Sequence, residues 1–145
     1  MIVLDANILL YAYDTESAQH RQARVYLEKI FSASDPVGLP IQSISAFLRI
    51  MTQQGLRSGC FSLSEAVEIV EEWLNLPQVR LLIPGERHWS IFQRMLIEGH
   101  ASGRLVTDAQ IAATTIEFGG ELQTNDRDFA RFPGLRWRNP LVPSR

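Results

Sequence analysis

The first twelve residues of the chain, which decide its fold, read MIVLDANILLYA. Residues 1–4 are apolar, and Asp5 ends this apolar run abruptly. A short, uniformly apolar run is typical of a strand that is buried on both faces, as in a parallel sheet. Residues 6–13 have the apolar character of a short helix. The chain is therefore predicted to begin with a strand and a helix, with Asp5 at the carboxyl end of the strand.

Strands and helices alternate along the rest of the chain. Further strands are predicted at residues 37–39, 79–83, 121–124 and 135–137, and helices at 17–31, 41–54, 86–98 and 108–118. Residues 62–65 form a capping box that predicts another helix, and residues 126–132 predict a helical turn. The apolar stripes around Trp73, Trp89 and Phe92 are most commonly core, and part of that surface could instead be a dimer or partner interface. The alternation indicates one α/β domain over residues 1–145, with a parallel sheet of about five strands and helices on both faces.

The composition of the chain excludes several classes of protein. Its 145 residues carry a formal net charge of −2, from 14 Lys and Arg against 16 Asp and Glu. This balance lacks the basic excess typical of nucleic-acid binders. The single cysteine, Cys60, excludes an intramolecular disulfide framework and a cysteine-rich zinc site. Because the sequence shows neither a signal peptide nor a membrane-spanning run, we expect a cytoplasmic protein with no membrane partner.

Four aspartates fall where the predicted topology brings them to one edge of the sheet. Asp5 follows the first strand, and Asp126 and Asp128 follow the fourth. Thr107 is a predicted N-cap for the helix that begins at Asp108. A helix that leads into a parallel strand begins at the carboxyl edge of the sheet, where the active sites of such folds lie. If the first and fourth strands are neighbours, these carboxylates converge on one site.

The polar residues at this edge are rich in oxygen ligands. Asn7, Thr124 and Asn125 add oxygen atoms to the four carboxylates. A set without paired His or Cys suits Mg²⁺ or Mn²⁺ rather than zinc, and a cation would offset the repulsion between the acids. Such a site is suited to phosphoryl transfer, in which bound metal activates a water. Taken singly, each aspartate is more commonly a cap or turn residue, so the predicted site depends on their convergence.

Three stretches of the sequence resemble the PIN-domain ribonucleases, and within them the VapC-type toxins of bacterial toxin–antitoxin pairs. The stretches are MIVLDANILLYA at residues 1–12, GRLVTDAQIAA at residues 103–113 and LQTNDRDF at residues 122–129. They are similar to the family's strand with Asp-x-Asn, its Asp-x-x-Ile-Ala-Ala helix and its Thr-x-Asp-x-Asp-Phe segment. Their order and spacing cover nearly the whole chain, which makes the set far more specific than any one motif.

The resemblance implies a PIN-like fold, in which the first and fourth strands of a five-stranded parallel sheet are adjacent. It implies a Mg²⁺-dependent endoribonuclease, with Mn²⁺ as a possible substitute. Asp5, Asp108 and Asp126 would match the metal-binding acids, and Asp128 would be an accessory catalytic acid. Thr107 and the neighbouring polar residues Asn7, Thr124 and Asn125 would support them. Proteins of this kind cleave tRNA or other structured RNA, form homodimers, and are blocked by a peptide of the cognate antitoxin.

The sequence departs from the family pattern on the helix after the second strand. Many PIN domains carry a Glu there, whereas residues 41–50 read IQSISAFLRI and Phe47 stands approximately at the Glu position. The number of metal ions is therefore left open. Gln42, Ser43 or Ser45 could supply an oxygen through water, although each is more commonly a polar residue of a helix face.

Four arginines are candidates for contacts with RNA phosphates: Arg104, Arg127, Arg136 and Arg138. Arg104 lies at the entry to the Asp108 helix, which places it near the predicted site. The other three lie near the C-terminus, where a solvated surface is an equally good interpretation.

Other functions fit the sequence less well. An aspartyl phosphatase usually needs a second Asp two residues after the nucleophile and a lysine, but position 7 is Asn and the one lysine, Lys29, is predicted in mid-helix. A signalling receiver also needs a lysine and uses an Asp after a later strand. A PIN-like module that binds RNA or a partner without cutting stays open, because the usual Glu is missing.

Overall fold

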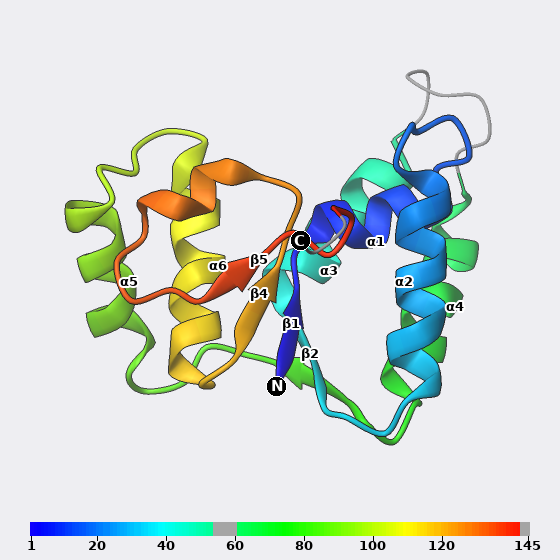
Figure 1. Ribbon diagram of the computed structural model, residues 1–145, viewed down its shortest axis with the longest axis horizontal. Coiled ribbons are helices and arrows are strands. Elements are labelled where there is room, and N and C mark those ends of the chain that lie inside the picture. Colours follow the sequence, from blue (N-terminus) through cyan, green and yellow to red (C-terminus); the bar gives the residue numbers. More distant parts are fainter. Residues whose placement is uncertain (54–60, 143–145) are drawn as a thin grey trace.

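The computed structural model describes residues 1–53 and 61–142, which fold around a five-stranded sheet (Figure 1). Every strand pair is parallel, and the strand order is β3-β2-β1-β4-β5. The parallel α/β sheet predicted from the sequence is confirmed, and the first and fourth strands are neighbours. The strands are β1 (Ile2–Leu4), β2 (Val37–Pro40), β3 (Val79–Leu82), β4 (Glu121–Gln123) and β5 (Trp137–Arg138).

Helices connect the strands, as parallel pairing requires. Ser62 and Glu65 form the predicted capping box at the start of the fourth helix, with each side chain bonded to the other's backbone N–H. The helices of the described residues are α1 (Ala6–Tyr13), α2 (His20–Ser32), α3 (Ile41–Met51), α4 (Leu63–Leu74), α5 (His88–Glu98), α6 (Leu105–Glu117) and the short 3₁₀ helix η1 (Arg127–Arg131).

The two faces of the sheet pack against different helices. Successive residues of a strand point to opposite faces, so Leu4 lies in a core with α1, α2, α3 and α4, whereas Val3 lies in a core with α5 and α6. Figure 1 shows α5 and α6 on one side of the sheet and α1, α2 and α4 on the other. The predicted arrangement, with helices on both faces, is therefore confirmed.

The register of the central strands builds the carboxyl edge of the sheet. Leu4 at the end of β1 is the direct partner of Gln123 at the end of β4. The backbone N–H of Asp5 donates to the carbonyl of Gln123 at 3.1 Å, which extends the pairing by one residue. The residues that follow these two strands, Asp5 and Thr124, therefore emerge side by side.

Aromatic side chains fill the centre of the larger core. Phe47 of α3 is fully buried, and its ring centroid lies 4.7 Å from that of Trp73 and 5.7 Å from that of Tyr13. The Trp73 indole N–H donates to the Tyr13 hydroxyl at 3.2 Å. Edge-to-face contacts of this kind add to the stability gained from burial alone. They hold α3 firmly against α1 and α4.

Several predicted boundaries were wrong. The helix predicted at 108–118 begins at Leu105, because turns that close on Ser102 and Gly103 start it early, and Thr107 therefore lies in its first turn and does not cap it. The helix predicted from residue 17 begins at His20, since a turn around Ser17 precedes it. The predicted helix end at residue 54 lies outside the described residues.

The two tryptophans that were predicted to be core differ in their exposure. Trp89 was predicted to be core, but its side chain is 64% exposed, because α5 buries Met95 on the face that packs against α6. Trp73 is buried as predicted. In the described part of the chain, no helix has both the length and the apolar character that a membrane crossing requires.

Candidate active site

Asp5 is the buried acid of the carboxyl edge. As the N-cap of α1, it accepts the backbone N–H of Ala6 on Oδ1 at 2.8 Å, and it accepts the Thr124 hydroxyl on Oδ2 at 2.7 Å. Burial raises the pKa of this carboxyl to about 6, although both hydrogen bonds act in the opposite direction. The charge of Asp126 makes a small contribution to this increase in the pKa of Asp5. Asp5 is therefore held in a fixed orientation and ionises less readily than an ordinary aspartate.

Thr124 links the acids that follow the two central strands. Its hydroxyl donates to Asp5 and accepts the side-chain amide of Asn7 at 3.2 Å and the backbone N–H of Asp126 at 3.0 Å. Asn125 donates its backbone N–H to Oδ1 of Asn7 at 3.4 Å. The structure thus brings together three of the supporting residues that the sequence predicted.

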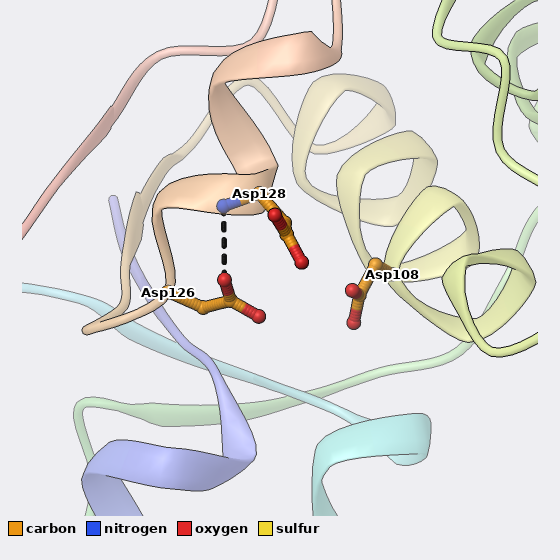
Figure 2. Close-up of side chains that lie close together, drawn as sticks. All are labelled: Asp108, Asp126 and Asp128. Carbon is orange, nitrogen blue, oxygen red and sulfur yellow. Dashed lines mark hydrogen bonds between the residues drawn. The ribbon is translucent and has the colours of Figure 1, made fainter.

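Asp108, Asp126 and Asp128 form a compact acidic group. One carboxylate oxygen from each lies within 4.8 Å of the other two, and Figure 2 shows the three side chains converging from α6, from η1 and from the residue that precedes η1. Asp126 caps η1 by accepting the backbone N–H of Asp128 at 2.9 Å. Among the residues that the structure describes, this is the one group of three or more His, Cys, Asp or Glu side chains that could hold a metal ion.

The electrostatics of the acidic group favour a bound cation. Burial, and to a lesser degree the charges of Asp5, Asp126 and Asp128, together raise the pKa of Asp108 to about 6. The guanidinium of Arg104 acts in the opposite direction but is less effective. The ligands are all carboxylate oxygens, and hard divalent cations such as Mg²⁺ prefer oxygen ligands. The donor set therefore fits a divalent metal ion.

The four predicted acids lie together at the carboxyl edge of the sheet. The resemblance to PIN domains implied that Asp5, Asp108 and Asp126 bind the metal and that Asp128 is an accessory acid. The structure groups Asp128 with Asp108 and Asp126, and leaves Asp5 beside them with both oxygens hydrogen-bonded. Asp5 lies close enough to affect the pKa of Asp108.

Comparison with known proteins identifies the family. Residues 2–135 match the sequence pattern of the PIN domain. This chain belongs to the PIN domain family. It is 38% identical to "Ribonuclease VapC33" of Mycobacterium tuberculosis (strain ATCC 25618 / H37Rv) over 141 residues, which cover 97% of this chain and 99% of that protein. It is 35% identical to "VapC ribonuclease Mb2897" of Mycobacterium bovis (strain ATCC BAA-935 / AF2122/97), which covers 97% and 96% of the two chains.

A solved structure supports the PIN fold of this chain. VapBC2 from Rickettsia felis, solved with a DNA fragment from its promoter, superposes with a TM-score of 0.71 at 17% sequence identity. The match covers 96% of this chain and 98% of that one. At this level of identity the comparison supports the fold alone, and it agrees with the match to the PIN domain pattern.

Helix α3 brings no carboxylate to the site of this PIN domain. Phe47 points into the aromatic cluster with Tyr13 and Trp73, away from the acids. Ser43 is fully buried, and its hydroxyl has no hydrogen-bond partner among the described residues. Gln42 and Ser45 line a cavity between α3 and α6.

The predicted RNA-binding arginines do not gather in one place. Arg104 lies beside the acidic group, with Nη1 3.7 Å from Oδ2 of Asp128, and Arg127 is exposed on η1 between two of the acids. Arg136 lies at the opposite edge of the sheet, where it donates to the Gly119 carbonyl at 3.1 Å. Arg138 lines a cavity with Tyr26 and Lys29 of α2. The structure therefore brings two of the four arginines to the site.

Sequence reasoning did not assign a positioning role to Arg131. Its guanidinium donates to the carbonyls of Gly99 at 3.1 Å and His100 at 3.4 Å, and to the Asp128 carbonyl at 3.2 Å. These bonds fasten η1 to the loop before α6, so they fix how Asp128 approaches Asp108. No sequence signal distinguishes this arginine from the others near the C-terminus.

Proposed function

We propose that this PIN-domain protein is a divalent-metal-dependent endoribonuclease and the toxin of a VapBC-like toxin–antitoxin pair. The observation that carries the proposal is the acidic group, because Asp108, Asp126 and Asp128 offer carboxylate oxygens within 4.8 Å of one another. The relatives named VapC ribonucleases match this chain over almost its full length, which supports the same activity here.

Mg²⁺ is the proposed metal, and Mn²⁺ the proposed substitute. Asp108, Asp126 and Asp128 would hold the ion, and Asp5 would adjoin it as a fourth acid. A divalent ion supplies water activation and neutralises charge on a phosphodiester. Thr124 keeps Asp5 and Asp126 at a fixed spacing, and a nearby positive charge would lower the raised pKa of Asp108 and so favour its ionised form.

RNA and an antitoxin protein are the proposed partners. Arg104 and Arg127 border the acids and would contact the phosphates on either side of the scissile bond. A VapB-like antitoxin is supported by the VapC name of the relatives and by the fold shared with VapBC2. We further propose a homodimer and a cytoplasmic location, since RNA substrates and reducing conditions are found there.

The proposal is tested with purified, antitoxin-free protein and total cellular RNA. Wild-type protein should cleave RNA with Mg²⁺ or Mn²⁺ and stop when EDTA is added. An Asp126→Asn variant should lose cleavage, whereas Asp35→Asn, which removes an exposed acid at the opposite edge of the sheet, should retain it. Cleavage that persists in EDTA, or in Asp126→Asn, would show that the acidic group is not the catalytic site.

A second candidate function is a PIN module that binds RNA or a partner without cutting. The burial of Phe47 favours it, because α3 then offers no acid to the site. Intact, metal-loaded protein that binds RNA and cleaves none would support this alternative.

A further inference from the structure

A surface cavity of about 420 Å³ lies between α3 and α6. Gln42, Ser45 and Arg49 line it from α3, and Thr107 and Gln110 line it from α6. Its volume falls within the range of roughly 300–1,000 Å³ that is typical of small-molecule sites. The function proposed above assigns no role to this cavity.

The cavity adjoins the acids through α6. Thr107 directly precedes Asp108, and Gln110 lies three residues after Thr107 on the same face of the helix. In Figure 2 the start of α3, drawn in cyan, lies below Asp108 on the side away from Asp128. A strand of RNA whose phosphate meets the acidic group can therefore place the next nucleotide in this cavity.

The chemistry of the cavity suits an anion with hydrogen-bond donors. Arg49 is the one charged residue in the lining of the cavity. The Arg49 side chain is exposed and forms no ion pair within residues 1–53 and 61–142. Gln42 Oε1 is buried, and the described residues offer it no hydrogen-bond donor. A buried acceptor without a partner is costly, so a ligand that donates to it is favoured. A nucleotide supplies both groups, a phosphate for arginine and base N–H donors for the amide.

We propose that the α3–α6 cavity binds one nucleotide of the RNA strand, adjacent to the phosphate that is cleaved. Arg49 holds the phosphate of that nucleotide, and Gln42 contacts its base, which makes Gln42 a specificity-determining residue. This inference rests on the proposed ribonuclease function, and it adds a substrate contact at a distance from the metal-binding acids.

The test measures RNA binding separately from cleavage. The probe is a short fluorescein-labelled single-stranded RNA of mixed sequence, with Ca²⁺ as the divalent ion, and a gel verifies that the probe stays intact. Fluorescence anisotropy gives Kd at several salt concentrations. Loss of one phosphate contact in Arg49→Ala should weaken binding and reduce the slope of log Kd against log salt by about 0.7, the value for one contact with a single strand.

Matched variants separate a phosphate contact from a change in overall charge or folding. Arg80→Ala removes an exposed arginine on β3 and should leave the slope unchanged. Arg49→Lys keeps the charge and should restore most of the slope. Gln42→Ala should leave the slope unchanged and alter the preference among RNAs that differ in base sequence. Circular dichroism verifies that each variant is folded.

Each outcome decides the proposal. A salt slope that falls in Arg49→Ala and not in Arg80→Ala supports the cavity as a nucleotide-binding site. This holds even if the wild-type protein cleaves no RNA. In that case the nuclease function fails and the binding site stands. Unchanged binding in Arg49→Ala, with normal metal-dependent cleavage, overturns the cavity proposal and leaves the nuclease function intact. Unchanged RNA binding with weakened capture of the co-expressed antitoxin also overturns it, since the cavity would then be a protein-docking site.

Discussion

The hydroxyl of Thr124 donates a 2.7 Å hydrogen bond to Oδ2 of Asp5, and this bond joins the ends of β4 and β1. The same hydroxyl accepts the backbone N–H of Asp126. One uncharged side chain thus orients the buried acid and the backbone of Asp126. The spacing of the acids depends on Thr124 as much as on the acids themselves.

Replacing Thr124 by Val should therefore reduce activity without removing an acid. The bond stabilises the ionised carboxylate, so its loss should raise the pKa of Asp5 above its present value of about 6. We expect metal affinity and cleavage at neutral pH to fall by roughly 10–100-fold, the usual effect of losing a partner of a metal site. Titration calorimetry and RNA cleavage assays measure both. Thr124→Ser keeps the hydroxyl and should stay near wild type, and equal losses in both variants would contradict this explanation.

Asp126→Asn should abolish tight binding of Mn²⁺ in the absence of RNA. The change removes one negative charge from the acidic group and keeps the side-chain shape. Mn²⁺ affinity should therefore fall by more than the roughly 10–100-fold caused by losing a residue that only hydrogen-bonds to a metal ligand. Calorimetric titration with Mn²⁺ measures this affinity, and Asp35→Asn is the control variant with the same change in net charge. Retained Mn²⁺ affinity in Asp126→Asn would show that the ion binds elsewhere.

The stability of the metal-free protein should fall as the pH rises through about 6. Asp5 and Asp108 have a pKa of about 6 in the folded chain against an ordinary value of 3.8, so the folded state holds their protons more tightly than the unfolded state does. This stabilisation is complete below pH 3.8 and is lost as both groups ionise. Mg²⁺ should compensate, because it binds the ionised carboxylates.

Thermal unfolding with and without Mg²⁺ measures this coupling. The rise in Tm caused by Mg²⁺ should be larger at about pH 8 than at about pH 5, at constant ionic strength. An equal rise at both values would mean that Mg²⁺ does not compete with protons at these carboxyls.

Phe47→Glu should destabilise the fold and should not restore the acid that many PIN domains carry. Phe47 is fully buried against Tyr13 and Trp73, so a carboxylate there would lack any partner. The loss in free energy of unfolding should exceed the roughly 3–5 kcal/mol of truncating a buried Phe. Denaturant unfolding measures the free energy of unfolding of Phe47→Glu and of Phe47→Leu, and Phe47→Leu should lose much less of it. A stable Phe47→Glu variant with higher activity would show that α3 can turn this position toward the acids.

Arg104→Ala should weaken RNA cleavage more than Arg136→Ala does. Arg104 lies 3.7 Å from Asp128, whereas Arg136 bonds to the Gly119 carbonyl at the opposite edge of the sheet. Because the Arg104 guanidinium is exposed, its loss should raise KM for RNA with little effect on folding. Initial cleavage rates at several RNA concentrations measure KM for both variants. Equal effects would indicate that RNA contacts both edges of the sheet.

Much of the fold could be predicted because parallel strands have a simple pattern. Short apolar runs that end at a polar residue marked β1 and β4, and the helices between them required a parallel sheet. The pairing of β1 with β4 could not be derived from periodicity, and it came from the resemblance to PIN domains. The start of α6 was missed because backbone bonds to Ser102 and Gly103 begin the helix, and no side-chain cap signals them.

The site was predictable in its membership and less so in its geometry. Strand ends placed Asp5, Asp126 and Asp128 at one edge, but which carboxylates approach each other depends on side-chain bonds. Arg136 and Arg138 are neighbours of Trp137 in sequence, yet Arg136 lies at the amino edge and Arg138 beside α2. Such placements follow from the register of a two-residue strand, which sequence patterns do not determine.

The bond between Asp5 and Thr124 spans 119 positions of the chain. During translation, β1 leaves the ribosome long before β4 exists, and the acids of η1 follow later still. A growing chain therefore carries Asp5 without its neighbours until residues 108–128 have been added. A chain that stops before residue 121 lacks β4, the strand that brings the acids together. The acidic group is therefore absent from every product that ends before β4.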